Sequence, residues 1–253
     1  MSSGNRWSSF FPRLKEVTLK GVHIALRMLY PPRCLVCDSL SDEAICVRCF
    51  SRLKFIKPPM CALCGKPYDE LAQAAPICSD CRRIKRWFDR CRCTVRYEDV
   101  AREMIHKLKY SGERRLASEM AKLMVETLND FSHPVDLVIP VPLHRKRLRE
   151  RGFNQAWLIA DVLSECINAR MNSTALIRAR ETKPQFDLEP KERLGNVRDA
   201  FELVEPSAVT DKVVLVVDDV MTVGATLNEC ARALKKGKPK AVYAVAFARA
   251  VGM

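Results

Sequence analysis

The chain has 253 residues, and its 43 lysines and arginines outnumber its 30 aspartates and glutamates, which gives a formal net charge of +13. A chain of this length can bury a substantial core or form two domains, and its mixture of apolar and charged residues excludes wholesale disorder. Three basic runs, at residues 82–87, 145–151 and 235–240, carry much of the excess charge. One such run is usually solvated surface, but three together favour a phosphate-bearing partner.

Residues 1–30 are predicted to form an amphipathic helix that docks on the rest of the chain, with a place on a membrane surface as the alternative. Five charged or titratable side chains interrupt every apolar stretch that could act as an export signal: Lys15, Glu16, Lys20, His23 and Arg27. No stretch of the sequence approaches the ~18 apolar residues needed to cross a bilayer. We therefore expect a cytoplasmic protein without a transmembrane segment.

Eight of the 12 cysteines form four CxxC pairs, and residues 31–90 are predicted to be a double zinc ribbon. The pairs are Cys34/Cys37, Cys46/Cys49, Cys61/Cys64 and Cys78/Cys81. Two CxxC turns bring four thiolates to one tetrahedral ion at ~2.3 Å, so four turns predict two structural zinc ions. A disulfide framework is the alternative, but no export signal supports it. Neighbouring pairs are expected to share an ion, although a cross-braced grouping has compatible spacing.

The remaining cysteines, Cys91, Cys93, Cys166 and Cys230, are expected to be small buried hydrophobic residues.

Residues 91–253 alternate predicted strands with predicted helices. Strands are expected at residues 93–97, 135–142, 174–178, 212–219 and 241–249. Helices are expected at residues 101–110, 114–130, 152–170 and 225–236. Continuous valine-rich strands are typical of a parallel sheet with helices on both faces. Such an open α/β sheet binds its ligand beyond the carboxyl ends of the strands.

The strand at residues 212–219 ends in Asp218 and Asp219, and a turn containing Gly224 follows it directly. The turn presents backbone N–H groups at the start of a helix, which is a natural phosphate site. Two carboxylates would repel a bare phosphate, but they can accept hydrogen bonds from ribose hydroxyls or help to hold Mg²⁺. Phosphoribosyl pyrophosphate (PRPP) with Mg²⁺ meets all these demands. The other interpretation is a strand end with two solvent-facing acids.

The motif "VVLVVDDVMTVGAT" closely resembles the ribose-phosphate signature of type I phosphoribosyltransferases. The wider chain resembles the ComF family of competence-associated proteins. The resemblance spans "YPPRCLVC", "IHKLKYSGERRLA", "PVPLHRKRLRERGFNQA" and "RARETKPQFDLEPKERLGNVRDAF", in the same order. It implies a phosphoribosyltransferase-like parallel sheet over residues 91–253, preceded by the small cysteine-rich domain.

The resemblance also implies roles for individual residues. Asp218 and Asp219 would contact the ribose hydroxyls during catalysis. The turn Thr222, Val223, Gly224, Ala225 and Thr226 would hold the 5′-phosphate. Arg145 and Lys146 would bind pyrophosphate, and residues 180–201 would be a covering loop that turns Arg180, Gln185 and Arg193 towards the site. Val223 departs from the small or hydroxyl residue that is usual in the signature, so only its backbone can donate.

Two functions remain open at this point. One is a phosphoribosyltransferase whose acceptor is unknown. The other, implied by the ComF resemblance, is a non-catalytic protein of DNA uptake whose zinc ribbons and basic runs bind single-stranded DNA. Its PRPP pocket would then be vestigial or serve to sense PRPP. Trp87 and Phe88 would then stack on bases, unless they form a core contact at the domain hinge. A DNA-transport ATPase as partner is implied by the family resemblance alone.

Overall fold

The structure is a computed structural model that describes residues 30–68, 76–182 and 195–250. The helix predicted for residues 1–30 lies almost entirely outside these ranges. The strands of the described residues are β1 (Arg90–Arg96), β2 (Leu137–Pro140), β3 (Arg170–Met171), β4 (Leu176–Arg178), β5 (Phe201–Leu203), β6 (Val213–Met221) and β7 (Ala241–Arg249).

The helices lie between the strands and in the ribbons. The α-helices are α2 (Val47–Ser51), α3 (Ser79–Arg83), α4 (Asp99–Tyr110), α5 (Arg115–Val125), α6 (Arg145–Arg151), α7 (Gln155–Cys166) and α9 (Ala225–Lys235). The described residues also include two short 3₁₀ helices, η1 (Glu126–Asp130) and η3 (Pro206–Ala208). Within the described ranges, no helix is both long and apolar enough to cross a bilayer.

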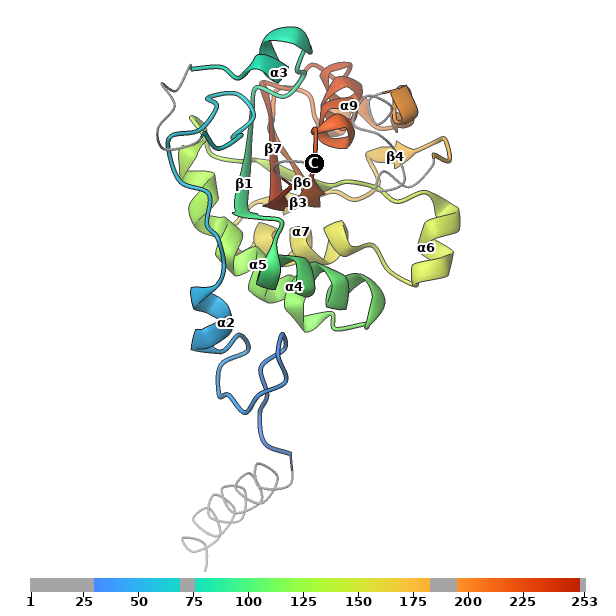
Figure 1. Ribbon diagram of the computed structural model, residues 1–253. Helices are drawn as coiled ribbons and strands as arrows, with labels where there is room; N and C mark the ends of the chain where they lie inside the picture. The colour runs from blue at the N-terminus through green and yellow to red at the C-terminus, as the bar shows by residue number, and fades with distance from the viewer. Residues whose placement is uncertain (1–29, 69–75, 183–194, 251–253) are drawn as a thin grey trace, which may run out of the picture.

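Five strands form one parallel sheet in the order β1-β7-β6-β2-β3. Every residue of β7 is buried, as expected of a central strand that has neighbours on both edges and helices on both faces. Helices α4, α5 and α7 cover one face of the sheet and α9 covers the other (Figure 1). The predicted α/β fold class, with helices on both faces, is confirmed.

The two halves of the cysteine-rich region pack on opposite faces of the sheet. Cys34, Leu35 and Leu53 join the core formed with α4, α5 and α7. Cys61, Cys64 and Cys78 join the core formed with α9. The linker between the halves runs antiparallel to β1, because Phe55 pairs with Val95 and Ile56 N–H donates to the carbonyl of Thr94 at 2.9 Å. The linker therefore covers an edge of the sheet that would otherwise present unpaired backbone groups.

Several local features differ from the sequence-based expectations. Residues 145–151 form α6, which ends at Gly152 with a left-handed φ of 78°, where no helix was expected. The helix predicted over residues 152–170 is shorter, because α7 ends at Cys166 and β3 follows. β4 and β5 form a separate two-stranded antiparallel sheet. The sequence predicts a short strand at β4 but neither β5 nor the pairing. Cys91, Cys93 and Cys230 are buried as predicted, but Cys166, at the end of α7, is exposed.

Candidate functional site

Two groups of four cysteines each bring their sulfurs together. In both groups the four Sγ atoms lie within 4.8 Å of one another: Cys34, Cys37, Cys46 and Cys49 form one, and Cys61, Cys64, Cys78 and Cys81 form the other. The grouping is therefore the sequence-local one, and the cross-braced alternative is wrong.

The spacing of the sulfurs fits zinc rather than disulfides. Cys37 Sγ lies 3.7 Å from Cys46 Sγ, and Cys64 Sγ lies 3.7 Å from Cys78 Sγ. A tetrahedron with Zn–S bonds of about 2.3 Å has sulfur–sulfur edges of about 3.8 Å, whereas a disulfide bond is about 2.05 Å long. Four thiolates leave no open coordination position, so both sites are structural.

Arginines balance the negative charge that four thiolates place around each zinc ion. Arg48 Nη2 approaches Cys37 Sγ at 3.6 Å in the first site. In the second site Arg249, from the end of β7, donates to the carbonyl of Cys64 at 2.6 Å and approaches its Sγ at 3.6 Å. Arg249 is only 4% exposed, so this contact joins the second zinc site to the centre of the sheet.

The acidic pair and the turn line one cavity at the carboxyl end of β6. Strand β2 ends with Pro140 opposite Val217, so Asp218 and Asp219 extend beyond their neighbour on that side. Both are buried, at 9% and 3% exposure. They share a cavity of about 320 Å³ with Thr222 and Thr226. The carboxylates and the turn thus face the same space, contrary to the interpretation as solvent-facing acids.

Asp219 is held by two partners from other elements. Lys109, near the end of α4, forms an ion pair with its Oδ2, and Gln155, at the start of α7, donates to its Oδ1 at 3.2 Å. Burial alone would raise the pKa of Asp219, but the Lys109 ammonium outweighs that effect and the pKa is lowered. Burial likewise would lower the pKa of Lys109, but Asp219 raises it. The pair is therefore charged on both sides.

Asp218 is in the opposite situation. Burial first, and the negative charge of Asp219 second, raise the pKa of Asp218 well above its ordinary value. Its Oδ1 accepts a hydrogen bond from the backbone N–H of Asp219 at 2.9 Å. The raised pKa favours one negative charge on the acidic pair, matched by the one positive charge of Lys109. Loss of the Asp218 proton would add an acceptor for a ligand hydroxyl or cation.

The turn has the geometry of an anion site. Gly224 caps the N-terminus of α9 with a left-handed φ of 77°. This backbone conformation favours glycine, and a Cβ at this position would lie 2.4 Å from Met221 Cε, so the end of that side chain would have to move. Val223 presents its side chain to the core beside α9. Within the described residues, no acceptor engages the N–H groups of Val223 and Gly224.

The basic residues predicted from the sequence lie around the cavity rather than in its wall. Arg145 lines a neighbouring cavity of about 890 Å³. Lys146 forms an exposed ion pair with Glu181 at 3.1 Å. Arg180 donates to the carbonyls of Asn196 and Arg198, at 3.0 and 2.6 Å. Gln185 and Arg193 fall outside the described residues.

The cavity of the acidic pair is also lined by four charged or amide side chains that the sequence did not single out: Lys109, Arg147, Gln155 and Arg178. Arg147 extends from α6, one position beyond the two basic residues that were predicted. Burial first and Arg147 second lower the pKa of Arg178, which lies in β4. Because these residues come from four separate elements, only the fold brings them together.

These features define a phosphoribosyltransferase-type α/β domain preceded by a double zinc ribbon. Family models agree: a double zinc ribbon domain matches residues 25–82, and a phosphoribosyl transferase domain matches residues 181–251.

Curated relatives match most of the chain. Competence protein F of Haemophilus influenzae is 29% identical, over 86% of this chain and 97% of its own length. Competence protein ComFC of Bacillus subtilis is 30% identical, over 85% and 94%. DNA utilization protein YhgH of Escherichia coli K12 is 30% identical, over 84% and 94%. The chain belongs to the ComF family of competence proteins.

A solved structure of glutamine PRPP amidotransferase from B. subtilis, complexed with ADP and GMP, aligns with a TM-score of 0.35 and 18% identity. The alignment covers 51% of this chain and 26% of that chain.

Metal analysis of the purified protein should give about two zinc ions per chain, because each cysteine quartet completes one tetrahedral site. Cys37→Ser should reduce the content to about one. Cys166→Ser, which changes an exposed cysteine outside both quartets, should leave it unchanged. One zinc ion in the unaltered protein would contradict the two-site assignment.

Asp218→Asn should raise the free energy of unfolding at neutral pH by about 1 kcal/mol, because it removes the cost of ionising a buried acid. The folded protein holds the Asp218 proton to a higher pH than the unfolded chain does. The stability that Asp218 contributes is therefore lost as pH rises from its ordinary pKa, in the unfolded chain, through its raised pKa in the folded protein. Denaturant titration across pH should show a shallower decline in the variant. An unchanged pH dependence would mean that Asp218 ionises normally.

Proposed function

We propose that the chain binds PRPP with Mg²⁺ in the cavity of the acidic pair and acts as a phosphoribosyltransferase on an acceptor still to be identified. The single observation that carries this proposal is the shared cavity of Asp218, Asp219, Thr222 and Thr226. A ligand there must offer hydroxyl groups or a cation to the acids and a phosphate to the turn. PRPP carries all three when it binds Mg²⁺.

Each group of the ligand would meet a suitable partner. Asp219, which Lys109 keeps ionised, would accept hydrogen bonds from the ribose hydroxyls, and Asp218 would add a further acceptor once it loses its proton. The amides of the turn and the N-terminus of α9 hold the 5′-phosphate. Arg147, with Arg145 and Lys146 next to it on α6, places positive charge where pyrophosphate would leave. Mg²⁺, when bound with the ligand, neutralises part of the pyrophosphate charge.

The role of residues 180–201 as a covering loop stays a proposal. Arg180 fixes the backbone at Asn196 and Arg198, which lie on the far side of the segment that contains Gln185 and Arg193. These two bonds join residues that flank the segment in the sequence. We propose that this segment excludes water from the reacting sugar when the ligand binds.

The names of the relatives support a biological setting for the proposed activity. Two are competence proteins and one is a DNA utilization protein, so we propose that this chain also serves DNA uptake. A DNA-transport ATPase partner, a cytoplasmic location and domain boundaries near residues 30 and 90 stay predictions.

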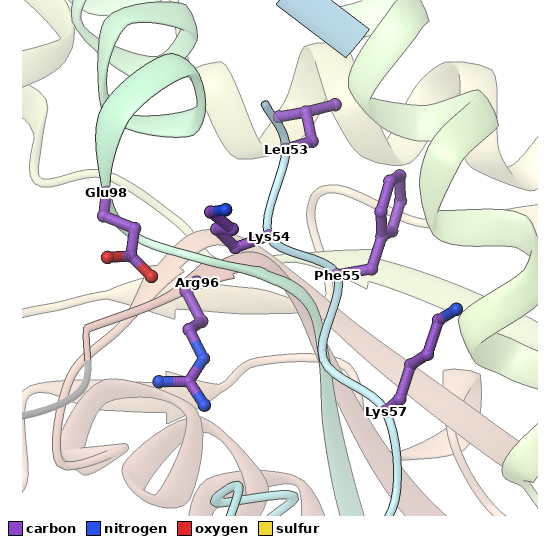
Figure 2. A pocket seen from close by; sticks show the side chains of 6 residues that line it. All are labelled: Leu53, Lys54, Phe55, Lys57, Arg96 and Glu98. Carbon is purple, nitrogen blue, oxygen red and sulfur yellow. The ribbon is translucent and has the colours of Figure 1, made fainter. Parts of the chain in front are cut away.

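A second candidate function is the binding of single-stranded DNA, which one surface of the molecule favours. A cleft of about 500 Å³ lies where the inter-ribbon linker meets the end of β1. Lys54, Lys57 and Arg96 line it with Phe55, and Glu98 is the one acid in its wall. Figure 2 shows Phe55 and Lys57 on one side of the linker and Arg96 and Glu98 on the other. Positive charge beside an exposed ring suits phosphates and stacked bases.

Asp219→Asn should weaken PRPP binding in the presence of Mg²⁺ by about tenfold to a hundredfold, because it removes a charged acceptor and the partner of Lys109. Isothermal titration calorimetry measures this directly. Asp211→Asn is a matched control, since Asp211 is exposed and its left-handed φ of 57° suits asparagine equally well. Equal affinities for the unaltered protein and Asp219→Asn would refute the ribose assignment.

Phe55→Ala should weaken single-stranded DNA binding by about 1–3 kcal/mol if a base stacks on the ring. Lys57→Met should lower the slope of log affinity against log salt by about 1. Val204→Ala, which changes an exposed apolar residue outside the cleft, is the control. Fluorescence anisotropy with a labelled oligonucleotide gives both quantities. If Phe55→Ala bound single-stranded DNA as tightly as the unaltered protein, this cleft would not be the DNA-binding surface.

A further inference from the structure

The hinge at residues 85–89, which leads from the second zinc site into β1, touches the turn at Gly224. Arg86 Nη1 donates to the carbonyl of Val223 at 3.0 Å. The backbone N–H of Trp87 donates to Asn228 Oδ1 at 2.8 Å, and Asn228 Nδ2 donates to the carbonyl of Lys85 at 3.3 Å. Three hydrogen bonds thus tie the cysteine-rich region to the turn and to the first part of α9.

The bond from Arg86 fixes the orientation of one peptide group in the turn. In a trans peptide the carbonyl and the following N–H point in opposite directions. Because Arg86 holds the carbonyl of Val223 on the hinge side, the N–H of Gly224 points away from the hinge. Within the described residues, that N–H meets no acceptor. The arrangement keeps a backbone donor available for an anion.

The hinge itself is anchored firmly. Phe88 is 2% exposed and packs in the core beside α9. Asp89 accepts a bond from the backbone of Val242 at 2.7 Å and pairs with Lys235 at 2.7 Å. Trp87 and Phe88 therefore form a hinge contact with the sheet domain, and Phe88 is not available for stacking on bases.

A second set of contacts connects the turn at Gly224 to the second zinc site. Met221 lies against Gly224, and its Sδ is 3.3 Å from Cys91 Sγ and 3.5 Å from Arg249 Nη1. The same guanidinium donates to the carbonyl of Cys64, a ligand of the second zinc site. Two side chains, Arg249 and Met221, thus connect the zinc ligand Cys64 to the turn at Gly224.

We infer that Arg86 is a positioning residue for the phosphate-binding turn, and that the second zinc ribbon is part of the 5′-phosphate site. This inference rests on the proposed function, because it assigns the turn to the ribose 5-phosphate end of PRPP. Zinc stabilises the second ribbon, and the ribbon positions the hinge at residues 85–89. Arg86, in that hinge, orients the Gly224 amide. Arg86 positions the turn through its hydrogen bond to the Val223 carbonyl. The positive charge of the guanidinium also attracts an anion to the turn.

The test compares Arg86→Met, Arg86→Lys and the control Arg82→Met in the zinc-loaded protein. Arg82 belongs to the same basic run and is exposed, so its substitution removes the same charge without touching the turn. The probes are ribose 5-phosphate, for the turn, and inorganic pyrophosphate, for the basic residues Arg145, Lys146 and Arg147 of α6. Titration calorimetry gives both affinities, and zinc content and the melting temperature report on folding.

Arg86→Met should weaken ribose 5-phosphate binding about tenfold, as expected when a charge-assisted bond is lost, while pyrophosphate binding stays within about twofold of the unaltered protein. Arg86→Lys should recover part of the loss, and Arg82→Met should match the unaltered protein. Trp87, kept as the sole tryptophan by Trp7→Phe and Trp157→Phe, should change its emission when ribose 5-phosphate binds. Arg86→Met should abolish that change.

The outcomes separate this inference from the proposed function. If the unaltered protein binds neither PRPP nor ribose 5-phosphate, the proposed function fails and the inference fails with it. If the unaltered protein binds both and Arg86→Met binds ribose 5-phosphate equally well, only the positioning role of Arg86 is overturned. An equal loss of both probes in Arg86→Met would show general damage to the fold and would also overturn the role.

Discussion

The ion pair between Lys109 and Asp219 allows the carboxyl end of β6 to be both acidic and buried. Asp218 and Asp219 are buried, at 9% and 3% exposure, and even the single negative charge of the pair needs a cation nearby. Lys109 supplies that cation from α4, with its side chain 19% exposed. The sheet contributes the other condition, since β2 stops at Pro140 and leaves room for a ligand beside the acids.

The two zinc ribbons belong structurally to the domain that follows them. The first adds Cys34, Leu35 and Leu53 to the core on the α4, α5 and α7 face, and the second adds its cysteines to the core on the α9 face. The linker between them pairs with β1 and closes that edge of the sheet. Ion pairs such as Lys107 with Asp38, at 2.9 Å, add contacts across the first of these junctions. The two ribbons thus pack against opposite faces of the sheet.

Much of this arrangement follows from local sequence patterns. CxxC spacing predicts two four-cysteine sites, and valine-rich runs predict buried parallel strands, because both depend on neighbours in the chain. Gly224 indicates a left-handed turn for the same reason. Lys109, Gln155, Arg147 and Arg178 could not be found in this way, since their role depends on four elements meeting at one cavity. In the sequence Arg86 is one residue of a basic run, and only the fold shows that it contacts Val223.

A crystal structure with PRPP and Mg²⁺ bound tests the central claim most directly. The account predicts ribose hydroxyls at Asp218 and Asp219, the 5′-phosphate against the amides of the Gly224 turn, and pyrophosphate towards α6. Lys109 should remain beside Asp219 or move only far enough to admit the hydroxyls. A ligand bound elsewhere, with the acidic pair and the turn untouched at saturating PRPP, would contradict it.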